Sequence, residues 1–139
     1  MIIKYKKLNP EAICFGYSRE GDACMDMYSI EKITIPARES VIIHTGIAVE
    51  IPEGYEGIVR GRSGMASKGI VTHVGTVDST YRGDVGIVLY NSTDFYYTVE
   101  KFDRVGQFSI HPVTKLHLIE SNELSETIRG DQGYGSSGK

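Results

Sequence analysis

The chain has little of what several large protein classes require. It has only two cysteines, Cys14 and Cys24, which have neither the number nor the spacing of a zinc site or a disulfide framework. No hydrophobic run approaches the length needed to cross a membrane. Residues 1–7 lack the order of charge and then apolar block that marks a signal peptide. We therefore expect a cytoplasmic protein with reduced thiols and no membrane association.

Positive charge is also sparse. Lysine and arginine number 15 against 18 aspartate and glutamate residues, which gives a net charge of -3. The densest basic cluster, Lys4, Lys6 and Lys7, is too small to indicate nucleic-acid binding, so no direct nucleic-acid partner is expected. A chain of 139 residues suits one domain with a core of its own.

Helical patterns are nearly absent, and short strands dominate. Ile47, Val49 and Ile51 alternate onto one face, as in a half-buried strand. Turn residues separate the apolar segments, among them residues 52–54 and 91–94. The pattern predicts an all-β sandwich or barrel-like domain. Its strands are expected over residues 41–44, 47–51, 57–60, 85–90, 95–99 and 116–119.

One short helix is expected over residues 63–69. Ser63 is a good N-cap, and Gly69 is a good C-terminal stop. The amides of residues 64–66 would then point outward at a helix N-terminus, where anions are attracted. Arg60 and Arg62 stand just before it. The alternative is an ordinary capped helix with solvated arginines.

A carboxylate and an aromatic ring stand close together between two apolar segments. Asp78 and Tyr81 lie three residues apart within residues 75–84. A β-hairpin there would project both side chains into one cleft. The alternative for Asp78 alone is a turn-former that bonds its own backbone.

The last eleven residues are rich in glycine and also carry groups that bind phosphate and bases. Arg129 can hold a phosphate through two parallel hydrogen bonds, and Tyr134 can stack on a base. Ser136 and Ser137 add hydroxyls, and a glycine-rich turn forms a concave anion site. The alternative is a plain flexible tail.

Taken in order, five segments resemble the motifs of the trimeric dUTPase family. They span nearly the whole chain, and five motifs in one order are far more specific than any one of them. The matching segments are Ala23–Tyr28, Gly61–Gly69, Gly75–Gly83, Asp103–Gln107 and Arg129–Gly138.

The resemblance implies a compact, jelly-roll-like β-barrel that forms a homotrimer with shared active sites. Residues 1–126 would form the domain, and residues 127–139 a flexible arm that closes over the site. The implied reaction is Mg²⁺-dependent hydrolysis of dUTP to dUMP and pyrophosphate by attack of water at the α-phosphorus. Such an enzyme keeps uracil out of DNA and supplies dUMP for dTMP synthesis.

The resemblance also implies a role for each matching residue. Asp78 would orient and help deprotonate the attacking water, and Tyr81 would pack against the deoxyribose and exclude a 2′-hydroxyl. Asp26 and Gln107 would bind the waters of Mg²⁺ rather than the metal itself. The remaining implied substrate-binding positions are Arg62, Ser63, Gly64, Thr72, Gly75, Arg129, Tyr134, Gly135, Ser136 and Ser137.

Three residues fall where the family pattern is broken or varies in places that matter for the site. Phe102 stands where a turn glycine often precedes Asp103, so we expect that turn to differ in shape. Thr72 and His73 fall in the base-reading segment, where side-chain contacts vary within the family, and a solvated His73 is the alternative to one that touches the base.

Two other functions remain open at this point. One is dCTP deaminase, which shares fold ancestry with the family but needs a different base pocket and a glutamate suited to attack on cytosine. The other is a nucleotide-dependent regulator that binds a protein partner, a role compatible with catalysis.

Overall fold

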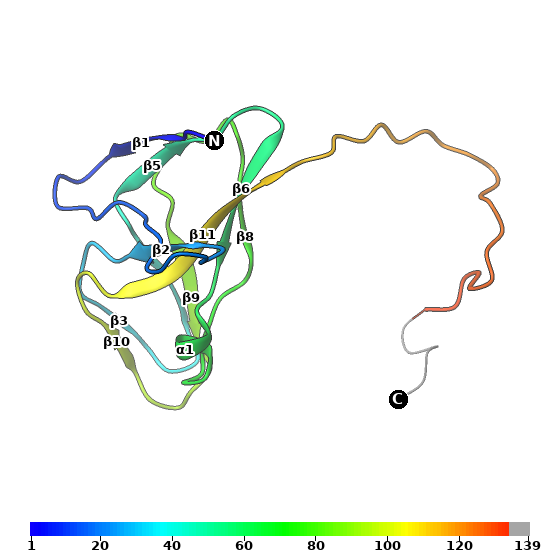
Figure 1. Cartoon of the computed structure of the whole chain (residues 1–139). Helices are drawn as coiled ribbons and strands as arrows, with labels where there is room; N and C mark the ends of the chain where they lie inside the picture. Colours follow the sequence, from blue (N-terminus) through cyan, green and yellow to red (C-terminus); the bar gives the residue numbers. More distant parts are fainter. Residues whose placement is uncertain (134–139) are drawn as a thin grey trace.

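The structure is a computed structural model that describes residues 1–133, and its regular secondary structure consists of antiparallel strands and one short helix (Figure 1). The elements in chain order are β1 (Lys4–Lys7), β2 (Met25–Tyr28), β3 (Ile33–Ile35), β4 (Ser40–Ile43), β5 (Ile47–Glu50), β6 (Tyr55–Arg60), α1 (Ser63–Ala66), β7 (Ile70–Val71), β8 (Gly75–Val77), β9 (Ile87–Asn91), β10 (Tyr97–Val99) and β11 (Arg104–Pro112).

The strands form four small sheets that share one core. The largest has the order β2-β11-β6-β8, and a second has the order β4-β9-β7. Two further pairs, β1-β5 and β10-β3, complete the body. This arrangement confirms the all-β, jelly-roll-like prediction, although the strands of residues 1–133 do not close into a barrel.

The core lies between these sheets and is built from aliphatic side chains around one aromatic pair. Phe108 of β11 is 1% exposed, and its ring centroid lies 5.5 Å from that of Phe15. Ile47, Val49 and Ile51 are all buried as predicted, but Ala48 between them is buried as well, so this strand is not exposed on alternate residues. Burial of such side chains is the main favourable term in folding.

Two strand predictions differ from the structure. Residues 116–119 form no strand and are exposed, because nothing in the described part of the chain covers them. The bounds of the longest strand, β11, were not predicted, and a register shift between Arg104 and Gly106 interrupts the alternation of buried residues there.

The predicted helix is shorter than expected, and its start is displaced. The N-cap residue is Arg62, with φ -100° and ψ 135°, so the prediction of Ser63 as N-cap is wrong by one residue. The amides of Met65 and Ala66 both donate to the carbonyl of Arg62 at 3.0 Å, so they do not point outward as predicted. Gly69 takes φ +80° and ends the segment as expected.

The hairpin predicted around Asp78 is not formed. The strands on either side of residues 78–86 belong to different sheets, since β8 pairs with β6 while β9 pairs with β4 and β7. The segment therefore connects two sheets, and each flanking strand finds its partner elsewhere in the chain.

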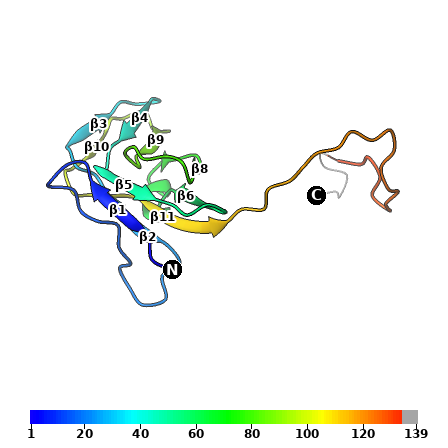
Figure 2. The ribbon, with the colours of Figure 1, turned by 90° about the horizontal axis from the view of Figure 1, so that it is seen from above.

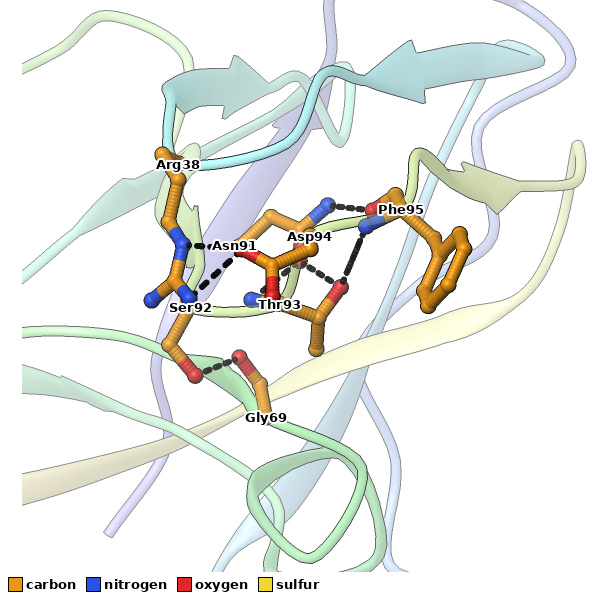
Figure 3. A network of polar contacts seen from close by, with 7 residues as sticks. All are labelled: Arg38, Gly69, Asn91, Ser92, Thr93, Asp94 and Phe95. Carbon is orange, nitrogen blue, oxygen red and sulfur yellow. Dashed lines mark hydrogen bonds and ion pairs between the residues drawn. The ribbon is translucent and has the colours of Figure 1, made fainter.

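A buried asparagine fixes the turn between β9 and β10, where the sequence predicted one (Figure 3). The Asn91 side-chain amide donates to the carbonyls of Ile35 at 3.1 Å and Phe95 at 2.7 Å. Its oxygen accepts from the amide and the hydroxyl of Thr93 at 3.0 and 2.8 Å. These four bonds satisfy a fully buried polar group and join β3 to the turn.

A long segment leaves the body after β11. Residues 113–133 run outward in both views (Figures 1 and 2), and their apolar side chains are exposed, with Leu118 at 95% and Ile128 at 108%. Such a segment gains little from packing on its own chain.

In the turn before β11, Phe102 takes φ 69°, so this turn holds a side chain in the region that favours glycine.

The close approach of β6 to β11 gives a stability prediction. A Cβ added at Gly57 would lie 2.6 Å from two ring atoms of Phe108, so Gly57→Ala forces the core to shift. We expect a loss of about 2 kcal/mol in the free energy of unfolding, measured by urea denaturation at fixed protein concentration. Gly16→Ala is the matched control because it meets open space, and an equal loss in both variants would contradict the prediction.

Candidate active site

The first polar pocket lies beside α1 and has a volume of about 400 Å³. Arg62 and Gly64 of the α1 turn line it on one side, and Asp103 and Arg104 at the start of β11 line it on the other. Lys68 also lines this pocket, so three cationic side chains surround it. A pocket of this composition suits a phosphate-bearing ligand.

Asp26 lies behind this pocket and contacts both arginines that line it. Its buried carboxylate accepts from the Ser18 hydroxyl at 2.6 Å and from Arg104 Nη1 at 3.1 Å. Its other oxygen lies 3.6 Å from Arg62 Nε. Burial raises the pKa of Asp26, but the hydrogen bonds from Ser18 and Arg104 and the charges of both arginines outweigh it, so the pKa lies below its ordinary value.

The two arginines are thereby held in fixed positions. Arg62 Nη1 also donates to the carbonyl of Arg104 at 3.0 Å, which links the α1 turn to β11 directly. A guanidinium that is bonded on one edge keeps its remaining donors aimed in one direction. The pocket therefore carries oriented positive charge rather than two mobile side chains.

Gln107 lies beside this cluster in the central sheet. On β11 it pairs with Asp26 of β2 on one side and with Arg60 of β6 on the other. Directly opposite residues of an antiparallel pair project from the same face, so the sheet brings Asp26 and Gln107 together as the sequence predicted.

The residues fit a hydrated Mg²⁺ better than a directly bound one. Among residues 1–133 there is no group of three His, Cys, Asp or Glu side chains able to hold a metal ion. The Asp26 oxygens already contact Ser18, Arg62 and Arg104, which leaves lone pairs for water but little room for an ion. Mg²⁺ commonly keeps several waters and takes further oxygens from substrate phosphates.

The second pocket lies where β8 leaves the sheet and has a volume of about 230 Å³. Asp78, Tyr81 and Asp84 line it together with Thr76, Val77, Val85 and Gly86. The Tyr81 amide donates to the carbonyl of Asp78 at 3.0 Å, which closes a turn and brings the two predicted residues into one pocket. They share a pocket through this turn rather than through the predicted hairpin.

The Tyr81 ring folds back over its own segment. Its hydroxyl donates to the carbonyl of Asp84 at 3.0 Å, and a Cβ added at Gly83 would lie 2.4 Å from the hydroxyl oxygen. Gly83 therefore has to be glycine for the ring to lie there. The Tyr81 residue is 46% exposed, so its side chain is accessible to a ligand.

Thr72 and Gly75 lie toward the far end of β8 from Asp78. Gly75 pairs with Val59 of β6, and the Thr72 methyl would contact a Cβ added at Gly61. The Thr72 hydroxyl lies within hydrogen-bond distance of the carbonyls of His73 and Val88. Its side chain is thus engaged by the backbone of its own chain.

The two pockets lie at opposite ends of the β6-β8 pair and share no lining residue. Gly57 pairs with Val77 and Val59 pairs with Gly75, so Asp78 falls level with Glu56 while Arg62 lies six residues further along the chain. At about 3.3 Å per residue, this offset separates Asp78 from Arg62 by roughly 20 Å.

The predicted tail residues are described only in part. The Arg129 Nε donates to the carbonyl of Gln132 at 2.9 Å, within a turn of its own segment. Tyr134, Gly135, Ser136 and Ser137 lie outside the described residues.

Several residues that line the two pockets or contact a lining residue were not singled out from the sequence. Arg104 stands inside the fourth motif, and its position next to Asp103 was the only available signal. His44 and Asp84 meet across 40 residues of sequence, and nothing in the local pattern indicates that contact.

Comparison with known proteins identifies the family. A family model described as dUTPase matches residues 10–138. The deoxyuridine 5'-triphosphate nucleotidohydrolase of Clostridioides difficile is 42% identical over 139 residues, covering 98% of this chain and 97% of its own. The chain belongs to the dUTPase family. The corresponding dUTPase of Trichodesmium erythraeum is 43% identical over 141 residues, with 99% of both chains covered.

Solved dUTPase structures share the fold. The dUTPase of Staphylococcus bacteriophage 80alpha with dUPNHPP superposes with a TM-score of 0.94 at 30% identity, covering 99% of both chains. A mutant dUTPase of phage phi11 of S. aureus, with a structural Mg(II) ion, superposes with a TM-score of 0.83 at 25% identity. That superposition covers 88% of this chain and 98% of the phage chain. Within residues 1–133 of the present dUTPase, no helix has the length and apolar character of a membrane span.

The lowered pKa of Asp26 predicts a pH-dependent contribution to stability. A depressed pKa stabilises the fold above the unfolded value, about 4, and the contribution is lost as the pH falls through the folded value. Asp26→Asn should therefore cost about 2 kcal/mol of unfolding free energy at pH 7, and the gap to wild type should narrow below about pH 4.

Chemical denaturation of both proteins between pH 7 and pH 3 measures this gap. Glu53→Gln serves as the control, because Glu53 is 88% exposed and its contact with Lys115 at 3.5 Å is open to solvent. A gap between wild type and Asp26→Asn that stays constant with pH would show that the charge of Asp26 is not the stabilising factor.

Proposed function

We propose that this dUTPase, which hydrolyses dUTP to dUMP and pyrophosphate, does so in active sites that are shared between copies of the chain. The supporting observation is the division of the site. The pocket with Asp78 and Tyr81 suits the nucleoside and the attacking water, and the pocket with Arg62 suits the phosphates. One chain holds them at opposite ends of β6 and β8.

The division argues for a homotrimer with shared sites. A nucleotide is too short to reach across the offset between the two pockets of one chain, but a neighbouring copy can bring its Arg62 pocket against Asp78. Closed rings built from one repeated contact leave every site equivalent. The exposed apolar side chains of residues 113–133 suit a role in holding such a neighbour, since they have no cover on their own chain.

Asp78 is the proposed base. Its carboxylate accepts a proton from water as the water oxygen forms a bond to the α-phosphorus. The bond from the α-phosphorus to the bridging oxygen breaks, and pyrophosphate leaves with the electron pair of that bond. A general base must first lie within reach of the proton that it accepts, and only then does its pKa matter. Asp78 is exposed and lines its pocket, so water can reach its carboxylate.

Tyr81 is the proposed specificity element for the sugar. Its exposed ring face packs against deoxyribose and leaves no space for a 2′-hydroxyl, so a ribonucleotide is rejected by steric clash. Backbone groups of residues 72–76, which include Thr72 and Gly75, read the hydrogen-bond pattern of uracil. Cytosine would leave those groups unpaired, a discrimination that binding alone can make large.

Arg62, Ser63 and Gly64 hold the phosphates, and Asp26 and Gln107 hold the waters of Mg²⁺. When bound, Mg²⁺ stabilises the charge that develops on the phosphoryl oxygens and the departing pyrophosphate. The contribution of this chain is to keep Arg62 fixed through Asp26, so that little reorganisation is needed when charge develops.

Residues 127–139 act as a flexible arm that closes over the bound nucleotide. Arg129, Ser136 and Ser137 would bind the γ-phosphate, Gly135 would allow close backbone approach, and Tyr134 would stack on uracil. The arm carries four glycines, at positions 130, 133, 135 and 138, so ordering it costs much entropy and depends on the ligand. A regulatory protein partner stays a prediction.

The direct test is pyrophosphate release from dUTP, UTP, dCTP and dTTP with and without Mg²⁺. We expect selective turnover of dUTP that depends on Mg²⁺, and release of ammonia from dCTP would instead favour a deaminase.

Asp78→Asn should lower kcat by at least about a hundredfold and change KM for dUTP much less, because it removes the base and keeps the pocket.

Ser79→Ala is the matched control for Asp78→Asn, because it alters the neighbouring residue of the same turn and retains the carboxylate. Equal changes in kcat and KM for Asp78→Asn would mean that Asp78 is structural rather than catalytic.

A further inference from the structure

The carboxylate of Asp84 fastens the active-site turn to the core. Its Oδ1 accepts from the Thr45 hydroxyl and from the amide of Ile47, both at 3.2 Å. Its Oδ2 lies 2.7 Å from Nδ1 of His44. Since a carboxylate accepts only, Nδ1 of His44 carries the proton and donates it.

The anchor point is among the least exposed parts of the molecule. Thr45 is fully buried, and its one hydroxyl proton is shared between the carbonyl of Val85 at 2.8 Å, the shorter contact, and Oδ1 of Asp84 at 3.2 Å. The amide of Val85 in turn donates to the carbonyl of Ile47 at 2.8 Å. Asp84 and Val85 are therefore tied to residues 44–47 by backbone and side-chain bonds together.

Tyr81 depends on the same anchor from the other side. Its hydroxyl donates to the carbonyl of Asp84 at 3.0 Å, and its amide donates to the carbonyl of Asp78. A displacement of Asp84 would thus move the ring of Tyr81 and, through the turn, Asp78. Asp84, Tyr81 and Asp78 line one pocket, which His44 does not line.

We propose that His44 and Asp84 form a positioning pair that sets the place of the Tyr81 ring and so the discrimination against ribonucleotides. The role of the Tyr81 ring in sugar selection rests on the proposed function, whereas the support that His44 and Asp84 give to the turn of residues 78–84 follows from the contacts alone. His44 acts through Asp84 and Tyr81 and does not touch the substrate. Its side chain is 54% exposed, so it contributes little packing to the core.

Because His44 is exposed, its effect on the position of Asp84 can be measured apart from its effect on the stability of the domain. An exposed pair adds little to global stability, yet a hydrogen bond of 2.7 Å to a group that is only 20% exposed restricts where that group lies. Removal of His44 should loosen one segment without unfolding the domain. Local opening of this kind is visible in amide exchange.

The test compares wild type, His44→Ala and His44→Asn, since the asparagine amide can donate from nearly the position of Nδ1. In His44→Ala we expect the ratio of kcat/KM for dUTP to that for UTP to fall about tenfold, and exchange at the Tyr81 amide to accelerate about tenfold. His44→Asn should restore both values. The melting temperature should stay within about 3 °C of wild type throughout.

Asp94→Ala is the matched control. It breaks an equally short ion pair, from Arg38 to Asp94 at 2.7 Å, whose members line neither pocket. It should leave the selectivity ratio and Tyr81 exchange unchanged.

Three outcomes would overturn the positioning role. They are unchanged exchange at Tyr81 in His44→Ala, failure of His44→Asn to restore it, or equal loss for dUTP and UTP together with a large fall in melting temperature. Absence of dUTP turnover in wild type would refute the proposed function instead, and the exchange measurement would still decide whether His44 braces the turn.

Discussion

The antiparallel register of β8 on β6 determines where the two pockets lie relative to each other. It places Val77 against Gly57, so the chain leaves the sheet for Asp78 at one end while β6 runs on toward Arg62 at the other. Neither pocket can be moved without shifting this register, and a shift of one residue would turn every side chain of β8 to the other face. The close contact of Gly57 with Phe108 holds β6 in place from the β11 side.

Each end then has its own carboxylate anchor. At one end Asp26 contacts Arg62 and Arg104, and at the other the carbonyl of Asp84 accepts from the Tyr81 hydroxyl. In both cases a carboxylate with little exposure gathers donors from distant parts of the chain. Such groups cost free energy to bury unless they are fully bonded, and full bonding fixes the geometry around them.

The sequence indicated the fold class and the pocket that Asp78 and Tyr81 share, because both depend on local pattern. Ile47, Val49 and Ile51 are buried as their spacing predicted, and Asp78 and Tyr81 share a pocket because only two residues separate them. The predictions failed where contacts between residues far apart in the sequence determine the structure. The register shift before Gly106 interrupts the pattern from which the bounds of β11 could be predicted. In place of the expected hairpin, β8 pairs with β6 and β9 pairs with β4 and β7. The contact between His44 and Asp84 has no local signature at all.

Subunit mixing tests the shared site most directly. Asp78→Asn and Arg62→Ala should each be nearly inactive alone, since each lacks one half of every site. If a site takes Asp78 from one chain and Arg62 from another, trimers refolded from an equal mixture should regain roughly a quarter of wild-type turnover, because one site in four then has both halves intact. Combining the two folded proteins without exchange of subunits should regain none. If the refolded mixture is no more active than the two variants alone, both halves belong to one chain, and the account is contradicted.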